Sequence, residues 1–337
     1  MSDKGILRQV LDMLADHVKG RESGSEHRSP SSLDSSESSH PGSEEMKFEI
    51  GKKLAGRYHL QEALGMGTYG QVWKAWDEQM ARHVAIKVLH ANEKAFERLH
   101  KEGIVGGGLS HKNVVNIFDF NPEEGFLVME FVEGKSLNEI LIERRKASTW
   151  ITYDETAQIL WQCLEAVEHT HHKQRVHGDI KPANILISEG TNVKLTDFGV
   201  AKILSDTTAQ DSPKGSVTYS APEVILGERG APDFQSDLFS LGMVAYLMLA
   251  KNHPFADSAA LEEIPERIVS HDFAPAPPSR IDSRVPRKLD DITMRLLEKD
   301  RSKRYRNSRQ ALDDLESNQP QSGIRNGLKT MFLGRPA

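Results

Sequence analysis

The order of its secondary-structure patterns most constrains the fold of this 337-residue chain. Between residues 58 and 131, short runs rich in β-branched and aromatic residues are separated by turn residues, a pattern typical of β-strands. After Gly134 the spacing of apolar residues becomes helical. The predicted strands are 58–64, 71–77, 83–89, 114–121 and 125–131, and the clearest predicted helices are 153–172, 234–250 and 287–297. Strands followed by helices indicate a two-part α+β domain.

The two ends of the chain differ from this domain in composition. Apolar residues between 5 and 19 recur near i, i+3, i+4 and i+7, which predicts an amphipathic helix within residues 1–20. Residues 21–45 contain ten serines and a single aliphatic residue, Leu33. Such a segment buries too little apolar surface to offset the entropy of ordering it, so we expect a disordered Ser-rich linker. The polar residues 318–337 are predicted to form a flexible tail.

Charge and cysteine content narrow the cellular context. The formal net charge is −6, which gives no reason to expect a nucleic-acid partner. The one cysteine, Cys163, lies in an apolar stretch, where a buried free thiol suits a reducing, cytoplasmic compartment. The longest apolar stretch, 238–250, has thirteen residues and is too short for a bilayer of about 30 Å. No membrane span is therefore predicted.

A glycine-rich loop lies between the first two predicted strands. Glycine lets a backbone approach phosphates closely and offer its N–H groups to them. The loop has the pattern G-x-G-x-x-G-x-V and consists of Gly65, Met66, Gly67, Thr68, Tyr69, Gly70, Gln71 and Val72. A strand follows it, whereas a helix follows the similar loop of a Rossmann fold. Taken alone, the loop is equally well explained as a hairpin turn.

A lysine follows in the next predicted strand, within Val84-Ala85-Ile86-Lys87. A lysine on an apolar strand is uncommon unless it is paired or bound to an anion, and a phosphate is such an anion. Glu102, in the helix predicted to follow, is the candidate carboxylate for Lys87. An ordinary solvated helix residue is the alternative interpretation of Glu102.

Four polar residues form the chemical centre of the sequence. Asp179 and Asn184 are five residues apart, and Asp197 follows thirteen residues later. Asp179 is suited to orient an acceptor hydroxyl, and Lys181 is suited to reach a phosphate as charge moves. Asn184 and Asp197 supply hard oxygen ligands for Mg²⁺. Predicted strands 185–187 and 193–195 fix their spacing. Any one residue could be an Asx-type turn residue, but all four at these offsets indicate phosphoryl transfer.

With these motifs in order, residues 58–315 resemble the eukaryotic-type (Hanks-type) serine/threonine protein kinase family, bacterial members most of all. The resemblance implies a two-lobed fold, with a β-rich N-lobe (58–131) that carries one key helix and a mainly helical C-lobe (135–315). It also implies that residues 64–72 cover the ATP phosphates and that Lys87 pairs with Glu102. The segment 64–72 begins with Leu64. The other implied ATP-binding residues are Val72, Ala85 and Leu186 around adenine, Met129 behind it, and Glu130 to Val132 as the hinge.

The resemblance also implies roles in the C-lobe. Asp179 would be the catalytic aspartate, assisted by Lys181, and Asn184 and Asp197 would hold Mg²⁺ or Mn²⁺. Arg304 would pair with Glu223, which ends the activation segment in Ala221-Pro222-Glu223, and Asp237 would anchor the catalytic loop. Residues 215–219 resemble the G-[ST]-x-x-Y segment of the family. Together with Lys181, this segment implies transfer of the ATP γ-phosphate to protein serine or threonine.

Two other classes of function share parts of this motif set. A pseudokinase that acts as a scaffold would keep the fold without the reaction, but Lys87, Asp179, Asn184 and Asp197 are all present. A small-molecule kinase shares the fold and catalytic aspartates but generally lacks the activation segment and its Ala-Pro-Glu stop. Because both are present, a protein substrate is the preferred interpretation.

The sequence departs from the family pattern at two places. Gly178 stands where most members carry an arginine that pairs with a phosphate on the activation loop. Activity is therefore predicted not to require phosphorylation at Thr207, Thr208 or Ser212. Glycines 106–108 would loosen the helix that carries Glu102, and the N-terminal helix is a candidate to dock on the kinase domain or on a partner. The tethered Ser-rich linker is a candidate for autophosphorylation.

Overall fold

A computed structural model of the chain describes residues 48–67, 70–89, 107–188, 192–198, 217–228, 232–256 and 263–317. The predicted amphipathic helix, Ser-rich linker and C-terminal tail lie outside these ranges. So do Thr68, Tyr69, Glu102 and the activation-loop residues Thr207, Thr208 and Ser212. Their structures and roles stay predictions.

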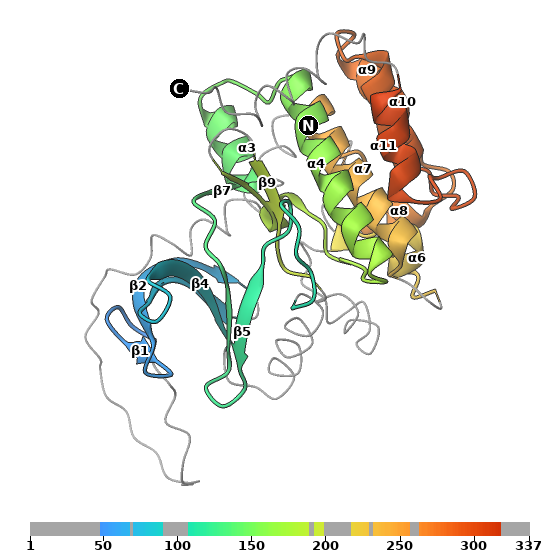
Figure 1. The fold of residues 1–337 in the computed structure, drawn as a ribbon. Helices are drawn as coiled ribbons and strands as arrows, with labels where there is room; N and C mark the ends of the chain where they lie inside the picture. The colour runs from blue at the N-terminus through green and yellow to red at the C-terminus, as the bar shows by residue number, and fades with distance from the viewer. Residues whose placement is uncertain are drawn as a thin grey trace, which may run out of the picture.

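The N-lobe is a curled antiparallel sheet with the strand order β1-β2-β3-β4-β6-β5 (Figure 1). Its strands are β1 (Lys53–Leu54), β2 (Tyr58–Gly67), β3 (Gly70–Asp77), β4 (Arg82–Leu89), β5 (Ile117–Asn121) and β6 (Phe126–Glu130). The strand predicted at 114–121 is wrong at its start. Val114 forms an isolated parallel bridge with Leu195 of the C-lobe, so the N-lobe strand begins only at Ile117.

The two faces of this sheet have different partners. One face packs into the N-lobe core, whose largest buried side chains include Tyr58, Trp73 and Phe126. Because side chains alternate along a strand, Val72 lies on the opposite face from Trp73. Val72 packs there against a small cluster with Ala85 and Met129. This second face forms the roof of the pocket described below.

The C-lobe is mainly helical, as expected. Its helices are α3 (Leu137–Lys146), α4 (Tyr153–His172), α6 (Pro222–Ile225), α7 (Phe234–Ala250), α8 (Ile264–Val269), α9 (Pro278–Ile281), α10 (Arg287–Leu296) and α11 (Ser308–Glu316), with a short 3₁₀ turn η1 (Pro182–Asn184). Capping boxes explain where the two long helices begin. Thr152 caps α4 together with Glu155, and Asp233 caps α7 together with Ser236.

Helix α7 is the central element of the C-lobe core. Every residue from 236 to 250 is buried, and α4, α9 and α10 pack against the helix. Cys163 of α4 is also buried, as predicted, and burial raises the pKa of its thiol. Within the described residues, no helix is both long enough and apolar enough to cross a membrane.

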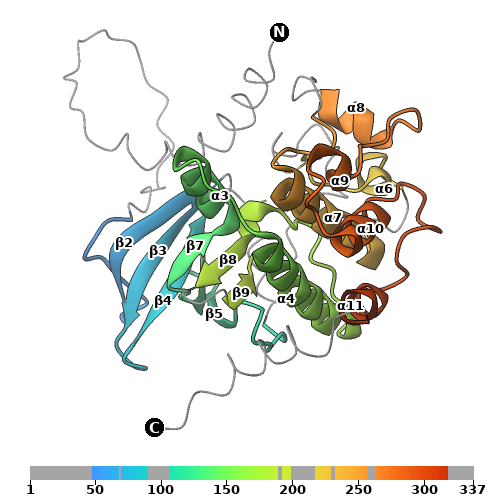
Figure 2. The same ribbon diagram turned by 90° about the horizontal axis from the view of Figure 1, so that it is seen from above.

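A small three-stranded sheet connects the lobes. It consists of β7 (Gly134–Ser136), β8 (Ile185–Ser188) and β9 (Asn192–Leu195), and Figure 2 shows it between the N-lobe strands and α4. Gly134 is required at the crossing of β7 and β8, because a Cβ atom there would lie 2.2 Å from the carbonyl oxygen of Ile187. The small sheet therefore packs tightly where β7 crosses β8.

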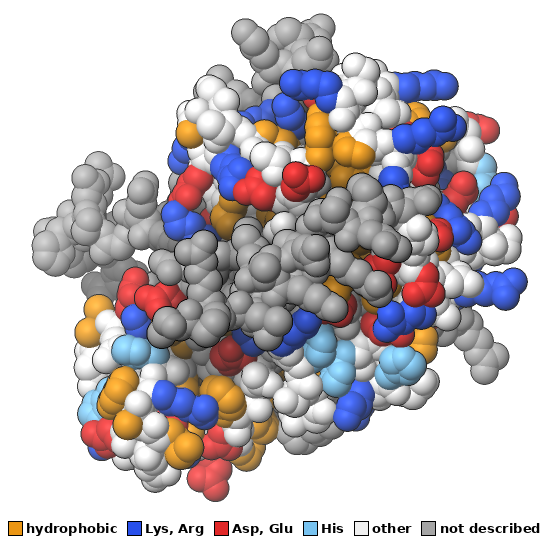
Figure 3. Space-filling view, turned by 45° about the horizontal axis from the view of Figure 1, so that its top comes forward, with side chains coloured by type: hydrophobic (Ala, Val, Ile, Leu, Met, Phe, Trp, Pro, Cys, Tyr) orange, Lys and Arg blue, Asp and Glu red, His pale blue; other side chains and the backbone are white. Residues whose placement is uncertain are grey.

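The described surface carries charges of both signs. In the space-filling view, Lys and Arg side chains are interspersed with Asp and Glu over the helical lobe (Figure 3). Exposed large apolar side chains, among them Met66, Met80 and Leu226, are scattered over both lobes.

Candidate active site

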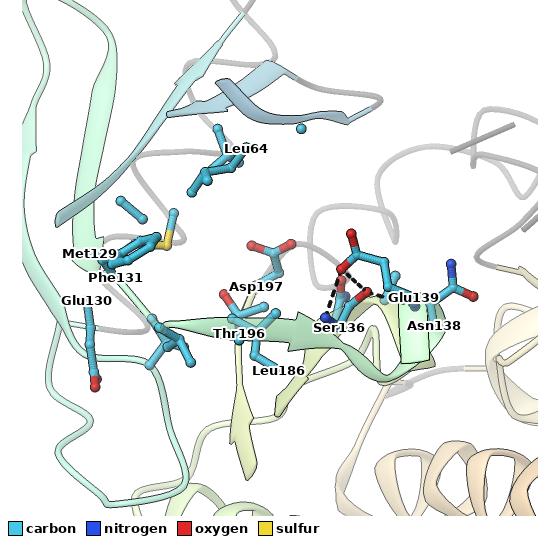
Figure 4. A pocket seen from close by; sticks show the side chains of 18 of the residues that line it. Leu64, Met129, Glu130, Phe131, Ser136, Asn138, Glu139, Leu186, Thr196 and Asp197 are labelled. Carbon is cyan, nitrogen blue, oxygen red and sulfur yellow. Dashed lines mark hydrogen bonds between the residues drawn. The ribbon is translucent and has the colours of Figure 1, made fainter. Parts of the chain in front are cut away.

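A pocket of about 330 Å³ lies between the N-lobe sheet and the small sheet. In Figure 4, Leu64 and Leu186 lie on opposite sides of this pocket, and Asp197 points into it from the C-lobe. Its walls are apolar at one end, near Met129, and polar at the other, near Asn184 and Asp197. An apolar slot with a few convergent polar groups is typical of a ligand-binding site.

The apolar end gathers most of the predicted adenine-binding residues. Ala85, Val115 and Met129 form a buried cluster, and the partly buried residues Val72, Phe131, Val132 and Leu186 pack against it. Phe131 lies within the predicted hinge 130–132. Val115 was not predicted as a site residue, although it is an apolar residue within the predicted strand 114–121. The cluster gives the pocket a flat, dry end suited to an aromatic base.

Four described residues of the glycine-rich loop line the pocket, namely Leu64, Gly65, Met66 and Val72. Gly70 and Gln71 lie in the β2–β3 hairpin, where Gly70 pairs with Gly67 and Gln71 pairs with Met66. The described part of the loop therefore covers the slot from above.

Glu130 lines the pocket, but its carboxylate is engaged elsewhere. It accepts a hydrogen bond from Nδ2 of Asn116 at 2.8 Å and forms an ion pair with Lys194 of β9 at 2.9 Å. These contacts tie the end of β6 to the C-lobe. The Glu130–Lys194 ion pair therefore connects the two lobes at the hinge, in addition to the backbone itself.

Lys87 and Asp197 meet at the polar end of the pocket. The Nζ atom of Lys87 lies 3.0 Å from Oδ1 of Asp197, and the side chains are 11% and 31% exposed. Burial by itself would raise the pKa of Asp197, but the nearby cations Lys87 and Lys181 outweigh it and lower this pKa. Asp197 is therefore ionised at neutral pH. The predicted partner of Lys87, Glu102, lies outside the described residues.

Asp197 also has an uncommon backbone conformation. Its φ angle is 64°, in the left-handed region that non-glycine residues seldom adopt. The short polar side chain of aspartate makes this conformation less costly than for most residues. The conformation aims the carboxylate into the pocket (Figure 4).

Asp179 lies within a compact hydrogen-bonded group. Its Oδ2 atom accepts hydrogen bonds from Lys181 Nζ at 2.8 Å and from Asn184 Nδ2 at 3.0 Å. Asn184 also donates to the backbone carbonyl of Asp179 at 2.8 Å. The turn η1 brings Asn184 back toward Asp179, so three residues predicted from spacing alone are adjacent in space.

Asp237 holds this loop from below. Its buried carboxylate accepts hydrogen bonds from the backbone N–H groups of His177, at 2.9 Å, and Gly178, at 2.7 Å. His171 of α4 contributes a third, from Nε2 at 2.9 Å. His171 was not predicted as a site residue, because three histidines lie close together at the end of α4 and only the packing shows which of them faces Asp237.

His177 connects the loop to the strand that carries Asp197. Its Nδ1 atom accepts from the backbone N–H of Asp179 at 3.3 Å, so Nε2 carries the proton and donates to the Thr196 carbonyl at 3.0 Å. Burial lowers the pKa of His177 despite nearby carboxylates, which keeps the ring neutral. The ring also packs on Phe198, with centroids 4.3 Å apart. A neutral imidazole thus fixes Asp179 relative to Asp197.

Glu223 and Arg304 form the buried pair expected from the sequence. Arg304 NH1 lies 2.7 Å from Glu223 Oε1, and neither side chain exposes more than 2% of its surface. Arg304 also donates to the carbonyls of Gln235 and Glu298. The pair joins α6 to the loop before α11, and the bond of Arg304 to the Gln235 carbonyl adds the start of α7.

Comparison with known proteins agrees with this fold and site. The family model described as protein kinase domain matches residues 58–314, so the chain belongs to the protein kinase family. The chain is 35% identical to the serine/threonine-protein kinase PrkC of Bacillus subtilis, over 80% of this chain and 41% of that protein. It is 33% identical to the serine/threonine-protein kinase PknA of Mycobacterium tuberculosis, over 77% of this chain and 61% of that protein. The chain therefore spans about two fifths to three fifths of the length of these relatives.

Solved structures show the same two-lobed α+β fold. The kinase domain of Mycobacterium tuberculosis PknI has a TM-score of 0.62 at 22% identity and covers 80% of this chain and 99% of that one. A structure of Rad53 residues 1–466 in complex with AMP-PNP has a TM-score of 0.60 at 26% identity and covers 77% of this chain and 64% of that one. The protein-kinase fold implied by the sequence motifs is confirmed.

Proposed function

We propose that this chain is a serine/threonine protein kinase that transfers the γ-phosphate of ATP to hydroxyl groups of protein substrates. The observation that carries the proposal is the placement of two groups at the polar end of one apolar pocket. The first group is Asp179 with Lys181 and Asn184, and the second is Lys87 with Asp197. Phosphoryl transfer needs these parts and little covalent chemistry from the protein.

Asp179 is proposed to orient the acceptor hydroxyl and to accept its proton. Lys181 and Asn184 both donate to Oδ2 of Asp179, which fixes the plane of the carboxylate. Within the described residues, Oδ1 accepts no hydrogen bond and is left for the substrate. Lys181 is placed to stabilise the charge that develops on the transferred phosphoryl group.

Asn184 and Asp197 are proposed to hold Mg²⁺. The amide nitrogen of Asn184 donates twice to Asp179, so its oxygen is turned to the other side, and Asp197 presents an ionised carboxylate. No group of three or more His, Cys, Asp or Glu that could hold a metal is found in the described residues. A set of two protein oxygens fits Mg²⁺, which keeps waters and binds substrate phosphates. When bound, the metal neutralises phosphate charge.

The remaining parts of the pocket are proposed to bind the nucleotide. The apolar slot that includes Val72, Ala85, Met129 and Leu186 is proposed to hold the adenine ring, and Lys87, which is paired with Asp197, is proposed to contact the α- and β-phosphates. The relative Rad53 is known in complex with AMP-PNP, an ATP-like nucleotide, which supports this assignment. We expect Mg²⁺ to be preferred over Mn²⁺, which chelation followed by addition of each metal would test.

The type of acceptor residue, the location and the partners are proposed from separate observations. The names of the relatives and Lys181 favour serine and threonine over tyrosine as acceptors. A single, buried cysteine favours a cytoplasmic location, and a net charge of −6 gives no support for nucleic-acid binding. Autophosphorylation in the Ser-rich linker is part of the same proposal.

One assay tests the central proposal. The wild-type chain and an Asp179→Ala variant would be incubated with γ-labelled ATP, Mg²⁺ and casein, followed by phosphoamino-acid analysis. We expect phosphoserine or phosphothreonine with the wild type and a loss of at least about 100-fold with the variant. Label transfer that survives the Asp179 change would overturn the assignment.

A further inference from the structure

A short segment beside the catalytic loop is held by side chains from the C-lobe core. Residues 217–220 directly precede Ala221 and α6, and the Ser220 N–H donates to the Val217 carbonyl at 3.1 Å. The Ser240 hydroxyl of α7 donates to the carbonyl of Tyr219 at 2.8 Å. We call residues 217–220 the acceptor-side segment.

Helix α7 places this segment next to Asp179. Asp237, which binds the backbone of the catalytic loop, precedes Ser240 by three residues, which is just under one helical turn of about 5.4 Å. Residues three apart lie on the same side of a helix. The catalytic loop and the acceptor-side segment are therefore attached to adjacent positions on one buried helix.

His253 supplies the second attachment. It follows α7, is only 5% exposed, and its Nε2 atom lies 2.9 Å from the carbonyl oxygen of Thr218. Its Nδ1 atom accepts the backbone N–H of Phe255 at 3.2 Å, so Nε2 is the protonated nitrogen and donates to Thr218. The ring meets the Tyr219 ring edge to face, at 5.7 Å and 85°. Two consecutive carbonyls, those of Thr218 and Tyr219, are thus bound by buried side chains.

The charge state of His253 suits this task. Burial lowers the pKa of His253 to about 4, although the hydrogen bond to Thr218 acts in the opposite direction. The ring is therefore neutral at physiological pH and keeps one donor and one acceptor. A neutral donor binds the carbonyl without bringing an unpaired charge into the core.

We propose that His253 is a positioning residue that fixes the acceptor-side segment as the surface on which the protein substrate lies beside Asp179. The inference rests on the proposed kinase activity. The proposed role of His253 differs from that of a residue that only stabilises the fold, because the neighbouring α6 is already attached through Glu223 and Arg304. Loss of His253 should therefore loosen the acceptor-side segment while the ATP pocket and the rest of the C-lobe stay in place.

Three variants separate positioning from stability. His253→Leu removes the donor and keeps an apolar side chain, whereas His253→Gln offers an amide donor to Thr218. Tyr246→Phe is the matched control, because Tyr246 of the same helix donates to the carbonyl of Ala276 at 2.8 Å, in a part of the C-lobe unconnected with Asp179. For His253→Leu we expect the KM for casein to rise about fivefold, while the KM for ATP is unchanged. His253→Gln should recover most of this loss, and Tyr246→Phe should show none.

Amide hydrogen exchange provides a readout independent of activity. Exchange at residues 217–220 should become faster in His253→Leu and stay at the wild-type rate in Tyr246→Phe. The inference is overturned if the KM values for ATP and casein rise together, or if Leu and Gln at position 253 behave alike. If the wild type transfers no phosphate at all, the proposed function fails and the substrate role of His253 fails with it. The exchange rates would then still show whether His253 anchors the segment.

Discussion

The Arg304 guanidinium and the Glu223 carboxylate form an ion pair that is almost completely removed from solvent, with an N–O distance of 2.7 Å. The two residues are 81 positions apart in the chain and join α6 to the loop before α11. Buried pairs of this kind cost desolvation when they form, but removing one partner leaves an uncompensated buried charge.

Replacement of Arg304 by alanine should therefore be severe. We expect the free energy of unfolding to fall by about 3–5 kcal/mol, measured by urea denaturation. The control is Lys135→Ala, which breaks a solvent-exposed ion pair with Glu143 at 2.7 Å. Exposed pairs contribute little, so this variant should unfold at the wild-type urea concentration. Equal losses in both variants would contradict the importance of the buried pair.

A second prediction concerns Gly134 at the crossing of β7 and β8. Gly134→Ala would place a methyl group 2.2 Å from the Ile187 carbonyl, and only a shift of the backbone can relieve that overlap. We expect a loss of about 1–3 kcal/mol in stability and a raised KM for ATP, because β8 carries Leu186 of the pocket. Gly108→Ala is the matched control, since among the described residues no atom beyond its two chain neighbours lies within 4 Å of its added Cβ. A Gly134→Ala variant with wild-type stability and KM would contradict the close contact.

A third prediction concerns Gly178, whose φ angle of 74° lies in the left-handed region favoured by glycine. Its backbone binds Asp237, and it has no side chain to contact a phosphate on the activation loop. We expect a variant with Thr207, Thr208 and Ser212 all changed to alanine to keep its phosphate-transfer rate within about twofold. Thermal unfolding would check that the triple variant is folded. If the folded variant lost most of its rate, the prediction would be wrong, and a cation other than one at position 178 would bind a phosphate on the activation loop.

A fourth prediction concerns acid stability. The pKa of His253 is about 4 in the folded chain, whereas a histidine in an unfolded chain titrates near about 6.5. Below about pH 6.5 the unfolded state therefore binds a proton that the folded state does not, and stability falls as the pH is lowered toward 4. The slope from this one group approaches about 1.4 kcal/mol per pH unit. Urea unfolding between pH 7.5 and 5 should show a flatter dependence in His253→Gln than in the wild type.

Much of the fold could be predicted from local patterns. Helices α4 and α7 begin and end at the predicted residues. Their starts are marked within the sequence itself by capping boxes at Thr152 and Asp233. Helix α10 ends one residue before its predicted end. The error at 114–121 has a tertiary cause, since Val114 pairs with Leu195, a residue 81 positions away that no local pattern connects with it.

The residues of the sequence motifs could be predicted, whereas the residues that hold these motifs in place could not. Fixed offsets identified Asp179, Lys181, Asn184 and Asp197, because a turn and two short strands convert those offsets into a constant geometry. His171 and His253 carry no such offset. Their roles depend on which carboxylate or carbonyl the packed helices bring within reach, and that information lies in the tertiary structure.

The attachment of two loops to α7 has a consequence for motion. Asp237 holds the catalytic loop and Ser240 holds the acceptor-side segment, and both lie on one rigid helix in the middle of the C-lobe core. We expect Asp179 and the acceptor-side segment to move together whenever the lobes move relative to each other, because both are attached to α7. In the proposed function, the alignment of the acceptor hydroxyl with Asp179 would then not depend on the distance between the lobes, and nucleotide exchange need not disturb a bound protein substrate.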